Sequence, residues 1–129
     1  MPTMQRLILA IGGIYGALGV GGAAIGAHLL RHSLSATQLE NFQQAVSYFL
    51  VHGVVLVALG AWLQGTRRAR LLKFCAVGFI IGTALFSGGL MLWTALNISW
   101  LRPLIPWGGS VLMAAWCGLA LAACFDSIA

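Results

Sequence analysis

Residues 40 to 52, ENFQQAVSYFLVH, place a polar side chain at every fourth position within an increasingly apolar segment. The four residues are Glu40, Gln44, Tyr48 and His52. Side chains four residues apart lie on one face of an α-helix, so these four form a single stripe. Because the chain continues after His52 as GVVLVALGAWL, the stripe carries an ionisable group below a lipid surface. Such a group is a functional candidate by default.

The composition of the chain is that of an integral membrane protein. The 129 residues are 60% hydrophobic and 7% charged, whereas an ordinary soluble domain is about 25% charged. A transmembrane helix requires about 20 predominantly apolar residues. The sequence therefore predicts an all-α protein with one domain, residues 1–129, folded as a membrane-spanning four-helix bundle. The predicted spans are residues 7–30, 42–63, 74–96 and 104–125.

The polar segment before the second span contains a helix start signal. Ser35 is followed three residues later by Gln38, and Thr37 by Glu40, and either pair fits a capping box. We therefore expect a helix to begin near Ser35 or Thr37. Residues 35–43 should lie at the membrane interface, either as the start of the second span or as a short separate helix.

Small residues recur along the first and third spans. In the first span their spacing alternates between three and four, which lines one helix face with glycine and lets another helix approach closely. The glycines predicted to pack helices together are Gly12, Gly16, Gly19 and Gly26 in the first span, and Gly78 and Gly82 in the third. In the third span, the stretch Phe86-Ser87-Gly88-Gly89 then weakens helix propensity.

Basic residues distinguish the two sides of the predicted bundle. Five lie on one side, namely Arg6, Arg67, Arg68, Arg70 and Lys73, and two on the other, Arg31 and Arg102. The excess of positive charge predicts that the first side, with both termini, is cytoplasmic. Because these charges flank apolar runs, they indicate topology and not a nucleic-acid interface. The expected location is the cytoplasmic membrane of a bacterium, with the lipid bilayer as the main partner.

Four short motifs resemble those of a known protein family. They are IGAH at Ile25–His28, AVxYxxxH at Ala45–His52, FSGxL at Phe86–Leu90 and PxGG at Pro106–Gly109. In this order they resemble the small four-helix membrane proteins of domain-of-unknown-function family 423, to which transmembrane protein 256 is related. The resemblance implies a helical membrane fold and no established activity, substrate or cofactor. The chain departs from the family pattern at Ile105, where threonine is expected, and at Met91, where tyrosine is expected.

The polar residues inside the spans predict one candidate site. His28, Tyr48, His52 and Ser87 fall in the predicted outer halves of their spans, where we expect a small outward-facing polar pocket. The expected partner of His52 across the bundle is His28 or Ser87. The two histidines allow three readings: hydrogen bonds that fix helix register, a titrating group in a solute or proton pathway, or two axial ligands of a b-type haem.

Enzymatic chemistry finds little support in the sequence. The only carboxylic acids, Glu40 and Asp126, lie outside the predicted spans, and no catalytic pair, triad, metal-ligand set or phosphate-binding loop is present. We therefore expect no catalytic activity, no cofactor and no metal. The leading hypothesis is a scaffold or accessory protein that self-associates or joins a larger membrane complex, and the alternative is a small-solute or proton pathway around His52.

Overall fold

The computed structural model describes residues 1–126 as a succession of helices without strands. The α-helices are α1 (Thr3–Ile25), α2 (Ala36–Trp62), α3 (Ala69–Thr83), α4 (Gly89–Leu96) and α5 (Leu104–Asp126). Two π-helical turns, η1 (Gly26–Leu30) and η2 (Ala84–Gly88), and a 3-10 turn, η3 (Ser99–Leu101), complete the helical structure.

Four helical segments are long and apolar enough to cross a membrane. They are Thr3–Leu30, Ala36–Trp62, Ala69–Leu96 and Ser99–Cys124. The π turns continue the helical backbone, so α1 with η1 makes one span, and α3, η2 and α4 make another. The predicted all-α fold with four spans is confirmed. All four spans begin four to six residues earlier than predicted, because helical structure extends into their polar flanks.

The second span begins at one of the two predicted caps. The Ser35 hydroxyl oxygen accepts a hydrogen bond from the Gln38 backbone N–H at 3.2 Å, and the Gln38 side-chain oxygen accepts one from the Ser35 N–H at 2.9 Å. From this capping box α2 runs without interruption to Trp62. A short separate interfacial helix is therefore wrong for this segment.

The glycine-containing stretch in the third span forms a π turn. In η2 the hydrogen-bonded turn contains one more residue than an α-helical turn, and π turns of this kind are frequent at functional sites. The helix then continues as α4 and ends at Asn97, whose φ of 56° is left-handed. Asparagine tolerates this conformation better than most residues and commonly ends helices in this way.

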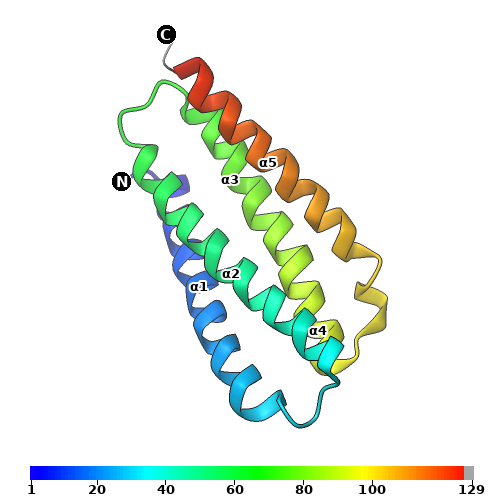
Figure 1. The fold of residues 1–129 in the computed structure, drawn as a ribbon. Helices are drawn as coiled ribbons and strands as arrows, with labels where there is room; N and C mark the ends of the chain where they lie inside the picture. The colour runs from blue at the N-terminus through cyan, green and yellow to red at the C-terminus, as the bar shows by residue number, and fades with distance from the viewer. Residues whose placement is uncertain (127–129) are drawn as a thin grey trace.

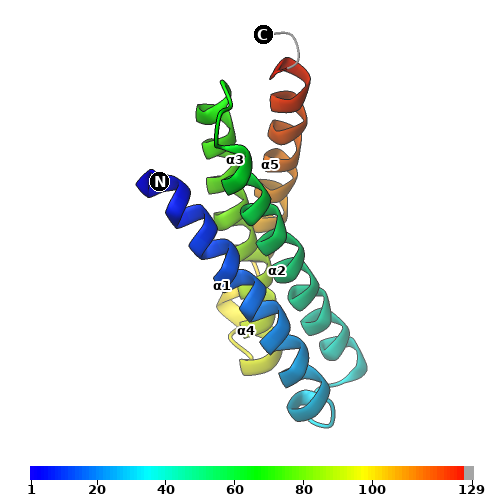
Figure 2. The ribbon, with the colours of Figure 1, turned by 90° about the vertical axis from the view of Figure 1, so that its left-hand side faces the viewer.

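The bundle consists of two pairs of sequential spans (Figure 1). α1 packs mainly on α2, and α3 with η2 packs mainly on α5. Contacts of α2 with α3, η2 and α4 join the two pairs, so α1 and α5 lie on opposite sides (Figures 1 and 2). The α2–α3 connection lies at the same end of the bundle as the start of α1 and the end of α5.

Buried polar side chains tie α1 to its neighbours. The Gln5 amide nitrogen donates to the Gly60 carbonyl oxygen on α2 at 2.6 Å. The Tyr15 hydroxyl donates to the Ile80 carbonyl oxygen on α3, also at 2.6 Å. In a membrane an unpaired buried donor costs several kcal/mol, so these bonds fix the position of α1 as well as satisfying its polar groups.

Glycines bring α1 and α2 into close contact. A Cβ atom built on Gly53 would lie 2.8 Å from both the Gly12 carbonyl oxygen and the Gly16 nitrogen. A Cβ atom on Gly19 would lie 2.9 Å from the Cβ of Leu50 on α2. Gly16 itself has open space where its side chain would be, so it contributes by exposing its backbone to Gly53.

The same kind of contact joins the second pair of spans. A Cβ atom on Gly82 would lie 2.9 Å from the Leu112 side chain, and Gly78 also faces α5. Of these glycines, Gly108 on α5 makes the closest backbone approach, because its Cβ would lie 2.5 Å from the Phe86 nitrogen and 2.9 Å from the Gly82 carbonyl oxygen. In the first pair Gly26 faces α2 in a similar way. Spacing along the sequence did not single out Gly53 or Gly108.

Substituted cysteines test the orientation of the bundle, which stays a prediction from the basic residues. In a variant without the three native cysteines, Ser99→Cys should react with an impermeant maleimide added to intact cells, because η3 lies opposite the basic end. Thr66→Cys, in the α2–α3 connection, should react only after the membrane is permeabilised. The reverse labelling pattern would invert the orientation.

Candidate functional site

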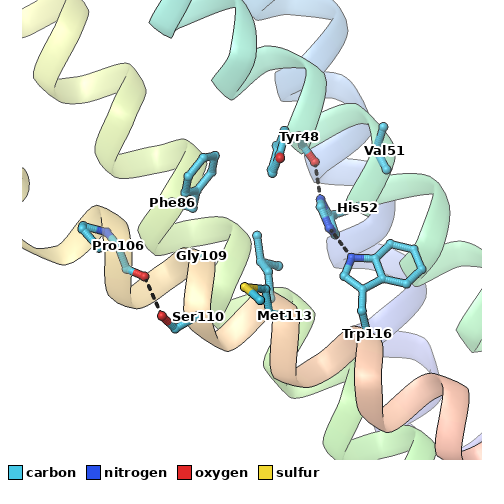
Figure 3. A pocket seen from close by; sticks show the side chains of 10 residues that line it. Tyr48, Val51, His52, Phe86, Pro106, Gly109, Ser110, Met113 and Trp116 are labelled. Atoms are coloured by element: carbon cyan, nitrogen blue, oxygen red, sulfur yellow. Dashed lines mark hydrogen bonds between the residues drawn. The ribbon is translucent and has the colours of Figure 1, made fainter.

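A cavity of about 600 Å³ lies between α2 and α5 and is open along one side of the bundle. It exists because these two helices belong to different pairs and make few direct contacts. We call it the α2–α5 groove. Its lining residues are Tyr48, Val51 and His52 from α2, Phe86 from η2, and Pro106, Gly109, Ser110, Leu112, Met113 and Trp116 from α5 (Figure 3).

The groove follows the helical repeat of α5. Pro106, Gly109, Met113 and Trp116 are three or four residues apart, so they share one helix face. Pro106 lies in the first turn of α5, where a helix needs no backbone N–H donor. Gly109 and its neighbour Ser110 are small, which hollows the groove at this level. Trp116 closes the groove near the middle of the span (Figure 3).

His52 is 4% exposed, and both of its ring nitrogens have hydrogen-bond partners. Nδ1 lies 2.8 Å from the Tyr48 carbonyl oxygen, one turn earlier on α2. Nε2 lies 3.2 Å from the indole nitrogen of Trp116 on α5 (Figure 3). A carbonyl oxygen can only accept and an indole N–H can only donate. The geometry therefore matches a neutral ring with its proton on Nδ1, which links α2 to α5 through Nε2.

Aromatic rings hold this link in place. The Phe79 ring, which is fully buried, lies 5.7 Å from the His52 ring and 5.0 Å from the Trp116 ring, between ring centroids. The Phe79 and Trp116 rings meet edge to face. Further along the groove, the Tyr48 and Phe86 rings are 4.7 Å apart. Contacts of this kind favour particular ring orientations, so these rings form a defined part of the groove wall.

The polar character of the groove ends at His52. Leu56 and Leu59 follow His52 on the same face of α2, and Leu72, Ala76 and Phe79 face them from α3; all are at most 2% exposed. This part of the described core has no polar side chain adjoining His52. A hydrated path from the groove through the bundle would have to cross it.

The structure divides the four residues of the predicted pocket. Tyr48 and His52 line the groove, but His28 is exposed in η1, and Ser87 is fully buried outside the groove lining. His28 or Ser87 as the partner of His52 is therefore wrong, since Trp116 takes that place. α1 and η1 lie on the side of α2 away from α5, which separates the two histidines and leaves the haem reading without its pair of ligands.

Ser87 shows that the depth of a residue in the membrane does not by itself determine whether the residue lines the groove. It immediately follows Phe86, which lines the groove, but the next residue on a helix points about a quarter turn away. Its hydroxyl oxygen, like that of Thr83 one turn before, is buried without a hydrogen-bond partner among the described residues.

Sequence reasoning missed Trp116, although a signal for it exists. Tryptophan in membrane proteins is enriched at the two interfaces. Trp116 instead lies twelve residues after the start of α5 and ten before its end. A tryptophan at mid-span requires a partner for its N–H group, and histidine is the best acceptor that the spans offer.

A double-mutant cycle tests the bond between His52 and Trp116. We expect His52→Phe and Trp116→Phe to show a coupling energy of about 0.6 kcal/mol, the average for hydrogen bonds between membrane helices. The measurement is reversible unfolding in mixed detergent micelles. Trp107→Phe is the matched control, because Trp107 is 70% exposed on the same helix and should not couple to His52. Equal coupling energies for both tryptophans would show that His52 and Trp116 do not form a specific hydrogen bond.

Three of the four sequence motifs meet at the groove. AVxYxxxH supplies Tyr48 and His52, FSGxL supplies Phe86, and PxGG supplies Pro106 and Gly109. The fourth motif, IGAH, lies apart in the last turn of α1 and in η1. Residues from three of the four motifs that carried the family resemblance therefore line one surface in space.

Comparison with known proteins leads to the same family. The family model described as "Protein of unknown function (DUF423)" matches residues 22–109 and so includes all four motifs. A UPF0382 membrane protein of Staphylococcus saprophyticus is 29% identical over 119 residues, covering 91% of this chain and 96% of the relative. No solved structure gives a significant match.

Further relatives come from distant bacteria. The UPF0382 membrane protein YwdK of Bacillus subtilis is 28% identical, with 92% of this chain and 97% of the relative covered. The UPF0382 inner membrane protein YgdD of Escherichia coli is 27% identical, with 87% and 85% covered. These similarities and the four apolar spans make the chain an integral protein of the bacterial inner membrane. Since the family model covers well over half of its length, the chain belongs to the DUF423 family.

Proposed function

We propose that this protein is a non-catalytic accessory protein of the membrane, which binds a membrane-spanning helix of a partner protein in the α2–α5 groove. The observation that carries the proposal is the one-sided attachment of α5. Only 17% of the residues in the apolar part of the fourth span are buried, against 44% in each of the second and third spans. The groove side of α5 is thus available to another helix.

The shape of the groove favours a helix over a small ligand. Small-molecule sites enclose most of the ligand surface, whereas this groove is partly open on one side of the bundle. From Pro106 to Trp116 it covers ten residues, or about 15 Å of helix, which is close to three turns. Gly109 and Ser110 would allow close approach, and Met113, 71% exposed, has the flexible side chain typical of adaptable binding surfaces.

The hydrogen bonding of the His52 ring favours a binding role for the groove over proton transfer or metal binding by this residue. Both ring nitrogens are already used, so the ring has neither a free lone pair for a proton or metal nor a free N–H group for a substrate. The apolar core next to it gives a proton no onward route. The alternative from the sequence is a solute or proton pathway. No observation favours that pathway as the exposed side of α5 favours a partner helix.

Photo-crosslinking in living cells tests the proposal. We expect p-benzoyl-phenylalanine at position 113, in the groove, to give a discrete adduct with another membrane protein. The same amino acid at position 121 should give none, because Leu121 is 53% exposed on α5 but does not line the groove. Filling the groove with Ser110→Trp should abolish the adduct from position 113.

Other outcomes count against the proposal. An adduct between two copies of this chain would assign the groove to self-association. If positions 113 and 121 crosslink to the same proteins, or if neither gives a protein adduct, the groove does not receive a partner helix.

A further inference from the structure

A second cavity lies at the basic end of the bundle, away from the α2–α5 groove. It has a volume of about 240 Å³ and is lined by Met4 from α1 and by Arg70, Lys73, Phe74 and Val77 from α3. From this arrangement we infer that the protein has a specific site for one anionic phospholipid, with the lipid phosphate at Arg70 and Lys73 and an acyl chain along Phe74 and Val77. The inference does not depend on the proposed function.

The two cations of this site point to an anion. Arg70 and Lys73 are three residues apart in the first turns of α3, so they share a helix face. Glu40, the one carboxylate whose side chain the structure describes, lies in the first turns of α2 at the other end of the bundle. Guanidinium and ammonium groups both bind phosphate oxygens, and the positive end of the α3 dipole adds to their attraction. Basic pockets between membrane helices are a known mode of anionic lipid recognition.

The apolar part of the cavity distinguishes a lipid from a free anion. Phe74 is 71% exposed, and Val77 lies one turn deeper than Lys73. From Arg70 to Val77 the helix advances seven residues, which is about 10 Å toward the bilayer centre. Met4 forms the opposite wall from α1. A free phosphate ion would contact only the two cationic side chains, whereas a phospholipid would also cover the apolar wall of the cavity.

The fold explains why the site is at this end. Ala69 starts α3 directly after the connection from α2, so the basic residues at the start of α3 lie at the level where the spans leave the apolar phase. α1 begins at the same end and places Met4 beside them. The cationic residues at the start of α3 would therefore meet the lipid head group, and the apolar residues that follow them would meet the acyl chain.

Native mass spectrometry of the full-length protein in detergent tests the site. Dioleoyl-phosphatidylglycerol should bind more tightly than dioleoyl-phosphatidylcholine, which has the same chains and no net charge. In the double variant Arg70→Gln/Lys73→Gln its Kd should rise roughly 10- to 30-fold, as expected for the loss of two cations near a lipid surface. The matched control is Arg31→Gln/Arg102→Gln, which removes two cations from the opposite end and should leave the Kd within about twofold.

The single variants Arg70→Gln and Lys73→Gln keep the test decisive if the double variant does not fold, since each should weaken binding by several-fold. Inorganic phosphate at millimolar concentration should not displace the phospholipid. Equal affinity for the two lipids, or equal losses in both double variants, would overturn the site. Full competition by inorganic phosphate would reduce it to a simple anion site.

Discussion

Replacing Gly108 with alanine should lower the free energy of unfolding by about 1 to 3 kcal/mol, the usual range for overpacking. The new Cβ atom would lie 2.5 Å from the Phe86 nitrogen and 2.8 Å from the Leu85 Cβ. The Phe86 nitrogen is a backbone atom, so relief requires α5 to move away from η2. This movement would weaken the other contacts between the two helices.

The adjacent residue provides the control for this substitution. A Cβ atom on Gly109 would lie 3.6 Å from the Phe86 ring, which is an ordinary contact distance. Gly109→Ala should therefore leave stability unchanged or raise it by up to about 1 kcal/mol, because alanine has the higher helix propensity. Both variants are compared by reversible unfolding in mixed micelles. If their stabilities are equal, α5 does not approach η2 as closely as the structure has it.

Truncating Phe79 should have the largest effect of any single side-chain deletion near the groove. Phe79 is fully buried and touches both His52 and Trp116. Phenylalanine-to-alanine changes in protein cores cost about 3 to 5 kcal/mol. Because lipid is as apolar as the core, the cost here arises from lost packing, and we expect about 3 kcal/mol.

Phe79→Ala should also loosen the bond between His52 and Trp116. In ¹⁵N-tryptophan-labelled protein, the indole N–H resonance of Trp116 should then move toward its position in His52→Phe. Phe74→Ala is the control, because Phe74 is on the same helix but 71% exposed, and both stability and the resonance should stay as in the unmodified protein. If the two phenylalanine variants behave alike, Phe79 does not support the groove.

Features that depend only on residues close together in the sequence were predictable from it. The four spans follow from apolar length, and the start of α2 follows from the pairing of Ser35 with Gln38 three residues later. Both signals are local, so they require no knowledge of which helices are neighbours. The weak helix propensity around Ser87 and Gly88 likewise marked the place of η2, although not its π-helical form.

Features that depend on which helices meet were not predictable in the same way. The stripe through Tyr48 and His52 gave the polar face of α2, but its periodicity could not reveal that α5 faces it. His28 was assigned to the site from its depth alone, and depth does not determine on which side of α2 a residue lies. Trp116 and Gly108 matter through contacts with residues far away in the sequence.

We expect the two halves of this protein to insert and pair separately during synthesis, because α1 pairs with α2, and α3 with its continuation pairs with α5. Each half completes most of its own interhelical contacts once its second span has been inserted. The pairing of helices within one half should therefore not require the other half. Gly65, exposed in the α2–α3 connection with a left-handed φ of 77°, is the natural point of division. Two coexpressed fragments, residues 1–65 and 66–129, should therefore assemble in the bilayer into one bundle that purifies through a tag on either fragment.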